Sequence, residues 1–206
     1  RRRSLAAAQA AMENGGDLLI LVQYKTEIEN PKAKDMATVG ILANVRDVLR
    51  APHVGVQMLV ELKRRVRFEG LTKKDPYLTG YFSEIEELDA GHNEELVVEA
   101  VAFLEEYAQA LGEANQQVMA NARNKTTPGA IADYIGGLLN LDFDTQMELL
   151  VMLDGELRLT NMLEHLEREL RITEVRNKIQ KDARDGADKA QRDYLLREQM
   201  RVIRKE

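Results

Sequence analysis

Residues 189–206 read KAQRDYLLREQMRVIRKE, and this stretch decides the fold that we expect for the C-terminal part of the chain. The sequence predicts a helix, yet no proline, glycine or polar loop follows Val202 and Ile203 to end it. Helices normally end in such a capping signal. We therefore expect the helix to lead into a further module of a longer polypeptide.

The segment before this stretch is nearly all polar. Between residues 176 and 193 only Ile179 and a few alanines interrupt the polar side chains, and a helix that is polar on most faces typically crosses solvent between domains. Apolar residues return afterwards, which predicts a contact with another subunit or another domain. The residues predicted to make this contact are Tyr194, Leu195, Met200 and Ile203.

Residues 91–170 have the apolar periodicity of helices, which predicts a helical bundle. Thr127 is followed by a proline, the pattern of a helix cap with proline at the first helical position. Thr145 and Glu148 have the spacing of a capping box, which predicts a helix over residues 147–153.

Residues 1–90 instead alternate apolar and other side chains over most of their length, which predicts strands. One helix precedes them, with Ser4 as its expected N-cap and Gly15 and Gly16 at its end. The apolar run LLILV, residues 18–22, predicts a strand that is buried on both faces. The predicted class is α+β, with parts at residues 1–90, 91–170 and 171–206.

The composition excludes several classes of function. The chain has no cysteine, which rules out disulfides, zinc–thiolate sites and a cysteine nucleophile. Its serines and histidines lack the spacing of a nucleophile motif or a metal site, and its glycines form no phosphate-binding loop. We therefore predict no catalytic, cofactor-binding or metal-binding residue in the 206 residues. No apolar run approaches the roughly 20 residues of a membrane span, and we expect a cytoplasmic protein without a membrane partner.

The run KRRVR, Lys63 to Arg67, is the one cationic cluster of the sequence. Two interpretations stay open. The cluster is either a solvated strand face or a patch that contacts phosphate groups. The second would make the protein a nucleic-acid-associated adaptor, and the net charge of -6 and the pI of about 5.3 weigh against it.

Six stretches resemble, in the same order, the N-terminal region of the Lon family of ATP-dependent proteases. They are RRRSLAAAQAAMENGGDLLILVQ (1–23), VGILANVRDVLR (39–50), VQMLVELKRRVRF (56–68), DPYLTGYFSEIEEL (75–88), GAIADYIGGLLNLDFDTQMELLVMLDGELRLTNMLEHLEREL (129–170) and RDYLLREQMRVIRKE (192–206). The last is the most specific, because in the family it lies on the long helix just before the ATPase module. The family normally begins with a strand pair that carries a leucine-proline-leucine-arginine motif, and this chain starts after it.

The resemblance implies a PUA-like β domain that lacks its first strands (1–90), a helical bundle (91–170) and a long neck or coiled-coil helix (171–206) that leads to an AAA+ ATPase module. It also implies that the region recognises unfolded or damaged proteins and helps to organise a homo-hexamer. The Walker motifs and the serine–lysine dyad of the family would follow Glu206. ATP, Mg²⁺ and ATP-dependent serine endopeptidase activity therefore belong to the parent protein, whose ATPase and protease modules are further implied partners.

Partly exposed apolar surface in the β half is the natural place for contact with unfolded chains, since such surface marks interaction sites. Met58, Tyr77 and Tyr81 are the predicted substrate contacts. The alternative is that these three residues belong to the core of the β domain. For the apolar residues after position 193, the alternative is packing on the absent ATPase module of the same polypeptide.

Overall fold

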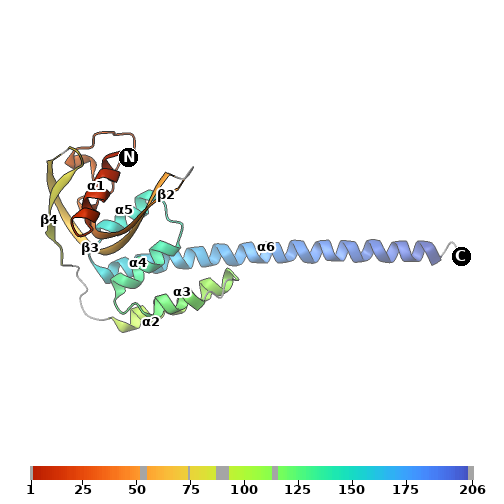
Figure 1. Cartoon of the computed structure of the whole chain (residues 1–206). Coiled ribbons are helices and arrows are strands. Elements are labelled where there is room, and N and C mark those ends of the chain that lie inside the picture. Colours follow the sequence, from red (N-terminus) through yellow and green to blue (C-terminus); the bar gives the residue numbers. More distant parts are fainter. Residues whose placement is uncertain (1, 52–54, 74, 87–92, 113–115, 204–206) are drawn as a thin grey trace. The chain divides into compact units, whose positions relative to one another are not determined.

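The structure, a computed structural model, describes all residues except 1, 52–54, 74, 87–92, 113–115 and 204–206 (Figure 1). The chain forms two compact units, each described here by itself. Unit 1 comprises Arg1–Leu88 and Leu141–Asp154, and unit 2 comprises Asp89–Asn140 and Gly155–Glu206. The predicted α+β class is confirmed, because an antiparallel sheet is combined with several helices, including a long one at the C-terminal end.

Unit 1 is built on an antiparallel sheet whose strands follow one another in sequence order. Strand β1 (Asp17–Ile20) pairs with β2 (Val39–Ala51), β2 with β3 (Gly55–Lys73), and β3 with β4 (Thr79–Glu84). In the part of the chain that the structure describes, β1 and β4 are therefore the two edges of the sheet.

Helix α1 (Arg2–Glu13) contacts β1 and β2. Ala8 and Ala11 are buried, and their small side chains let the helix backbone approach the strands closely. The helix ends at the predicted glycine pair. Gly15 and Gly16 both have positive φ, and the N–H of Gly16 donates to the carbonyl of Ala11 at 2.5 Å.

Two details of the prediction for this region are wrong. Ser4 is not the N-cap, because α1 already begins at Arg2 and Ser4 lies within it. The run 18–22 is not a strand buried on both faces. Strand β1 stops at Ile20, and its apolar side chains are only half-buried, because an edge strand has a neighbour on one side alone.

The core of unit 1 lies mainly on β2 and β3. A short 3-10 helix, η1 (Ala33–Asp35), leads into this part of the chain. Besides Ala8 and Ala11 of α1, the buried apolar residues are Met36, Ala37, Val39, Ala43, Val45, Val66 and Phe68.

Helix α5 (Phe143–Val151) starts earlier than the predicted capping box implies. Its N-cap is Asp142, whose Oδ1 accepts a hydrogen bond from the N–H of Thr145 at 2.9 Å. The predicted cap at Thr145 is therefore wrong, because a carboxylate three residues earlier already satisfies the free N–H of the first turn.

Helix α5 also belongs to unit 1, which corrects the predicted bundle over residues 91–170. Arg65 of β3 donates from Nε to the carbonyl of Leu150 at 3.2 Å, and α5 contacts β2. These contacts join residues far apart in the sequence, and they place residues 141–154 with the sheet instead of the bundle.

Unit 2 is a helical bundle. It contains α2 (Glu94–Ala110), α3 (Gln116–Arg123), α4 (Pro128–Leu138) and the first part of α6 (Gly155–Ile203), and both α2 and α4 pack on α6. Its buried apolar core includes Ala100, Leu104, Ile131, Ile135, Leu159, Met162 and Leu166. Thr127 caps α4 as predicted, because its hydroxyl accepts the N–H of Ala130 at 3.3 Å.

Arg158 of α6 is fully buried, which is rare for a charged residue. Its Nε atom lies 3.1 Å from Oδ1 of Asp133 in α4, whose side chain is still 44% exposed. The contact is ionic, because the Nε–H is not aligned for a hydrogen bond. Since a buried charge is tolerated only when it is paired, this ion pair holds α4 and α6 in one arrangement.

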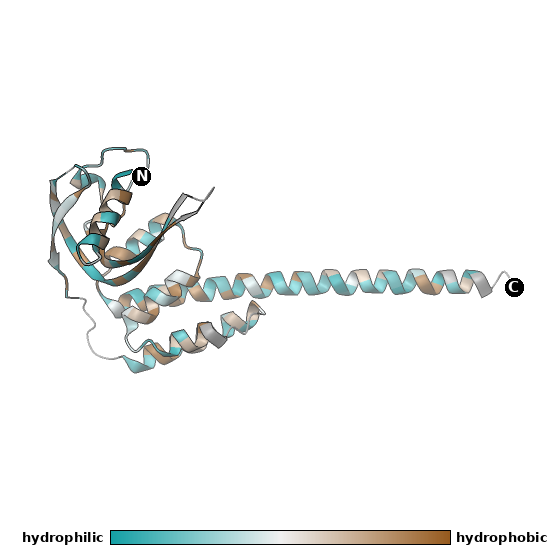
Figure 2. Cartoon of the chain, viewed as in Figure 1, coloured by the Kyte–Doolittle hydropathy of each residue, from teal (hydrophilic) through white to brown (hydrophobic). Residues whose placement is uncertain are grey.

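The second half of α6 has no core of its own. Every described side chain after Thr173 is exposed, and Figure 2 shows hydrophilic residues along most of this part. Gly186 lies within it, and nothing lies within 4 Å of the place where a Cβ would be. The predicted neck, residues 171–206, continues the last helix of the bundle, since α6 runs unbroken from Gly155 to Ile203. None of the described helices combines the length and apolarity required to cross a membrane.

The ion pair predicts an asymmetry between its two partners. Asp133→Asn should destabilise unit 2 by about 3 kcal/mol, because it removes a carboxylate that pairs with the buried Arg158 charge. Arg158→Met should cost less than about 1.5 kcal/mol, because the buried charge is removed and Asp133 still reaches water. Urea unfolding followed by circular dichroism at 222 nm measures both values.

Glu167→Gln is the matched control on the same helix. Glu167 forms an exposed ion pair with Arg171 at 2.6 Å, and its loss should change stability by no more than about 0.5 kcal/mol. Equal costs for Asp133→Asn and Arg158→Met would contradict the role given to the buried charge.

Candidate functional site

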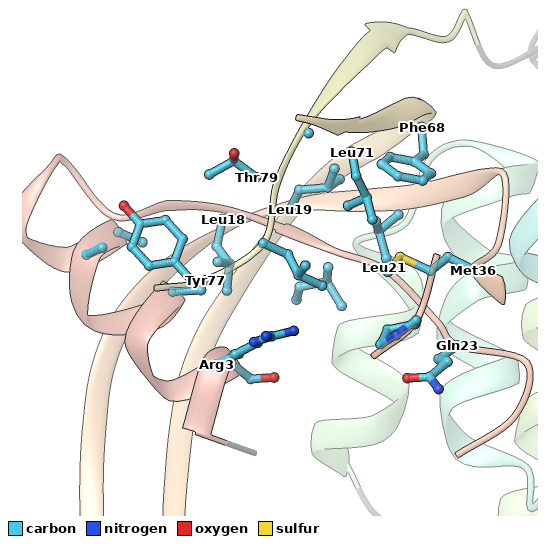
Figure 3. Close-up of a pocket in the computed structure, with 18 of the residues that line it drawn as sticks. Arg3, Leu18, Leu19, Leu21, Gln23, Met36, Phe68, Leu71, Tyr77 and Thr79 are labelled. Atoms are coloured by element: carbon cyan, nitrogen blue, oxygen red, sulfur yellow. The ribbon is translucent and has the colours of Figure 1, made fainter. Parts of the chain in front are cut away.

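Unit 1 contains a groove with a volume of about 1360 Å³. Its walls come from α1, β1, the loop after β1, β3 and β4 (Figure 3). Both edge strands of the sheet therefore border it. Pockets for small molecules typically have volumes of roughly 300–1,000 Å³, so the size of the groove favours a larger occupant, such as a segment of polypeptide.

The lining of the groove is mainly apolar. Figure 3 shows side chains from β1, from the loop and from β3 turned toward one another across it. The labelled apolar residues are Leu18, Leu19, Leu21, Met36, Phe68, Leu71 and Tyr77. Because the β1 side chains are only half-buried, the groove presents apolar surface to solvent, which is typical of an interaction site.

The loop over residues 21–31 forms one rim, and side-chain hydrogen bonds hold its conformation. Gln23 donates to carbonyls within the loop, among them that of Ile28 at 2.9 Å. Arg3 of α1 donates to Oδ1 of Asn30 at 2.8 Å. Hydrogen bonds therefore hold the loop in one conformation and connect it to α1, which forms the neighbouring wall.

Asn44, a buried polar residue of β2, fixes the corner between α1 and β1. Its Nδ2 atom donates to the carbonyl of Gly15 and to Oδ1 of Asp17, both at 3.0 Å. Gly16 must be glycine, because its φ is 88° and a Cβ there would lie 2.7 Å from Nδ2 of Asn44. Lys63 of β3 forms an ion pair with Asp17 at 2.6 Å, so four elements meet at this corner.

The hydrogen bond from Lys63 holds the pKa of Asp17 below its ordinary value of 3.8, and the hydrogen bond from Asn44 acts in the same direction. A carboxylate with a lowered pKa stabilises the folded chain above its unfolded value. That stability is lost as the pH falls from about 3.8 through the lowered pKa.

Most side chains of the predicted cationic cluster form ion pairs or hydrogen bonds within unit 1. Lys63 pairs with Asp17, and Arg64 pairs with Glu84 at 2.6 Å. Arg65 donates to a backbone carbonyl of α5. Three of the cluster's four cations thus have partners in the folded chain, which reduces the charge available to a phosphate group.

The structure brings two of the three predicted substrate contacts to the groove. Met58 and Tyr77 both line it. Tyr81 does not, although its side chain is 70% exposed on β4. The alternative interpretation as core residues is wrong for Met58, which is 40% exposed, and for Tyr81. Contact of these residues with a substrate stays a prediction.

Several residues of the groove are not predicted by the sequence. The sequence predicts a buried strand at Leu18 and Leu19 and gives no signal for Leu71 or Phe82, yet all four line the groove. The apolar run of β1 was visible, but no local signal shows that a strand forms the edge of a sheet.

Three of the predicted contact residues on α6, Tyr194, Leu195 and Met200, are exposed. Leu196, another apolar residue of the same stretch, is exposed as well. The side chain of Ile203 lies outside the described residues. Contact of this surface with a subunit or a module remains a prediction.

Among the described residues, no group of three or more histidine, cysteine, aspartate or glutamate side chains could hold a metal ion. His53 and His92 lie outside the part that the structure describes, whereas His165 lies on α6. The described residues therefore offer an apolar groove but no cluster of metal ligands.

Comparison with known proteins agrees with these features. The family model described as "ATP-dependent protease La (LON) substrate-binding domain" matches residues 1–168. The Lon protease of Lawsonia intracellularis is 32% identical over 210 residues, which cover 100% of this chain and 25% of that protein. The Lon protease of Escherichia coli (strain K12) is 26% identical over 208 residues, with 100% of this chain and 26% of that protein covered.

Solved structures show the same fold. The N-terminal domain of Mycobacterium avium complex Lon protease matches with a TM-score of 0.66 at 20% identity, over 81% of this chain and 86% of that one. A Lon N-terminal domain protein from Xanthomonas campestris matches with a TM-score of 0.54 at 16% identity, over 80% and 84%. The chain spans about a quarter of the length of the curated relatives it matches.

The corner around Asp17 generates a pH prediction. Lys63→Gln removes the partner that lowers the pKa of Asp17, so the variant should be less stable than the parent chain at pH 7. The difference should shrink as the pH falls from about 3.8 through the lowered pKa of Asp17, because below that pKa Asp17 is protonated in both proteins. Thermal unfolding at a series of pH values measures the difference.

The double variant Asp17→Asn/Lys63→Gln serves as its control. At pH values above the lowered pKa of Asp17, Lys63→Gln should have a much smaller effect in the Asp17→Asn background than in the parent. A pH-independent difference between Lys63→Gln and the parent would show that Asp17 is not the group responsible.

Proposed function

Because the chain belongs to the family of substrate-binding domains of the ATP-dependent protease La (LON), we propose that unit 1 captures unfolded or damaged proteins by their apolar segments. The observation that carries this proposal is the groove, whose apolar lining is open to solvent and whose size suits a polypeptide. Folded proteins bury most of their large apolar side chains. A site of this kind therefore favours unfolded chains over native ones.

We further propose that the parent protein is a cytoplasmic ATP-dependent serine endopeptidase that assembles as a homo-hexamer. The relatives that carry the name Lon protease support this, as does the long α6. ATP and Mg²⁺ would bind outside the 206 residues. Tyr194, Leu195 and Met200 would then contact the ATPase module or a neighbouring subunit, since an exposed apolar cluster on a polar helix suits such a role.

A nucleic-acid adaptor receives less support from the structure. Lys63, Arg64 and Arg65 have partners within unit 1, and the chain carries a net charge of -6. Repulsion of the phosphate backbone by the net negative charge opposes such binding. Capture of protein substrates is therefore the function that we propose.

Substitution of a groove residue tests the proposal. Met58→Ser should weaken binding of a reduced, carboxymethylated globular protein about fivefold, because the groove loses apolar area worth about 1 kcal/mol. Met58 is already 40% exposed, so the change should leave the fold intact. Fluorescence anisotropy with the labelled unfolded protein, and with its native form, measures the affinities.

Leu59→Ser is the matched control, because Leu59 is the next residue on β3, is more exposed than Met58 and does not line the groove. Its affinity should stay within about twofold of the parent. Equal binding of native and unfolded protein, or equal loss in the two variants, would refute capture by the groove.

A further inference from the structure

Asn14 and Gly15 form a chemically labile pair directly after α1. Asn14 is the only asparagine of the chain that is followed by glycine. The backbone nitrogen that follows an asparagine can attack its side-chain amide, and glycine permits this attack best because it has no Cβ to hinder it. Asparagine is accordingly one of the thermolabile residues of proteins. Both reacting atoms belong to adjacent residues, so the reaction needs no group from another part of the polypeptide.

The backbone at the end of α1 leaves the attacking nitrogen without a hydrogen bond. The N–H of Asn14 donates to the carbonyls of Ala10 and Ala11, at 3.2 and 3.0 Å, and the N–H of Gly16 also donates to Ala11. Among the described residues, the N–H of Gly15 has no acceptor. Gly15 lies outside α1 and has a φ of 96°. No helical hydrogen bond therefore fixes the peptide link that has to rotate.

The side-chain amide of Asn14 is held by a single printed contact of modest strength. Its Nδ2 atom donates to the carbonyl of Ala10 at 2.7 Å, at an exposed position. Water can replace such a bond, and the net stability that it contributes is small. The side chain can therefore leave this position and turn its Cγ atom toward the nitrogen of Gly15.

We propose that Asn14 is a site of spontaneous deamidation, and that its conversion to isoaspartate disrupts the corner held by Asn44. Hydroxide takes the proton of the Gly15 nitrogen, which then bonds to Cγ of Asn14. The Cγ–Nδ2 bond breaks, and ammonia leaves with a proton from water, which regenerates the hydroxide. Water opens the resulting five-membered succinimide at either carbonyl, giving aspartate or isoaspartate. The reaction consumes only water, so this inference does not depend on the proposed function.

Isoaspartate changes the path of the main chain at the corner. The main chain then runs through the former side chain and is longer by one carbon, or about 1.5 Å. The carbonyl of Gly15 accepts a hydrogen bond from Asn44 at 3.0 Å, and the carbonyl of Gly16 accepts one from the N–H of Val45 at 2.7 Å. A Cβ on Gly16 would already lie 2.7 Å from Nδ2 of Asn44. The corner has no room for the longer chain, so these hydrogen bonds should be lost.

The new charge acts in the same direction as the longer main chain. Both products carry a carboxylate at the C-terminal end of α1, where the helix dipole disfavours an anion. The last turn of α1 contains no basic residue, and the helix ends on Glu13. Asn14→Asp introduces this charge without the extra carbon, so the variant separates the two effects.

Incubation of the 206-residue chain in warm, mildly alkaline buffer tests the reaction. Trypsin releases residues 4–25, which contain Asn14 as their only asparagine. Mass spectrometry measures deamidation of this fragment, and a methyltransferase that labels isoaspartate identifies the product. A synthetic peptide of residues 4–25 gives the rate without a fold. The folded chain should react within about tenfold of the peptide rate, because a helix end opens at little cost.

Hydrogen exchange, followed by NMR, tests the consequence at the corner. In the deamidated fraction, separated by ion exchange, the N–H of Val45 should exchange at least about tenfold faster than in the unmodified chain, because its acceptor has moved. Asn14→Asp should accelerate the exchange less. Asn14→Gln keeps an amide but would have to close a six-membered ring, so its Val45 exchange should stay slow throughout the incubation.

Three results would overturn the inference. The first is a folded chain that reacts more than about tenfold slower than the peptide, because the fold would then protect the pair. The second is isoaspartate formation with unchanged exchange at Val45. The third is an equal acceleration of Val45 exchange during incubation of Asn14→Gln, which would assign the loss of the corner to other chemistry.

Discussion

A single buried amide holds the corner on which unit 1 depends. Asn44 reaches from β2 to the carbonyl of Gly15 and to the carboxylate of Asp17, and Gly16 leaves the space that it needs. An amide buried without partners is costly, so this corner has one arrangement of low free energy. Because α1 and β1 leave the corner as two walls of the groove, the shape of the groove follows from the same hydrogen bonds.

In unit 2, the buried charge of Arg158 fixes the arrangement of two elements, as Asn44 does in unit 1. The ion pair between Arg158 and Asp133 joins α4 to α6, and these two helices also carry buried apolar residues of the core of unit 2. Beyond Thr173 the helix has no core to stabilise it. It can persist there because adding residues to a helix that is already nucleated is far easier than starting a new one. The half of α6 that packs in the bundle thus stabilises the helical conformation of the solvent-exposed half.

Some features with a local cause could be predicted from the sequence, although the caps predicted at Ser4 and Thr145 are wrong, and features set by distant contacts could not. The cap at Thr127 and the glycine pair after α1 each depend on a few adjacent residues, and both are present. The assignment of α5 failed because it depends on Arg65, a residue of β3 that lies far away in the sequence. The groove was only partly foreseen, through Met58 and Tyr77, since its other lining residues meet only when the sheet has formed.

The exposed half of α6 also has a mechanical consequence. From Thr173 to Ile203 it extends about 45 Å, at about 1.5 Å per residue. A tilt of about 5° where the helix leaves its bundle would move the far end by about 4 Å over that length. Gly186, near the middle of this segment, is less favourable in a helix than alanine by about 1 kcal/mol. The exposed helix should therefore bend most easily at Gly186. A small rotation at the base of α6 would therefore displace a partner bound at its C-terminal end by a larger distance.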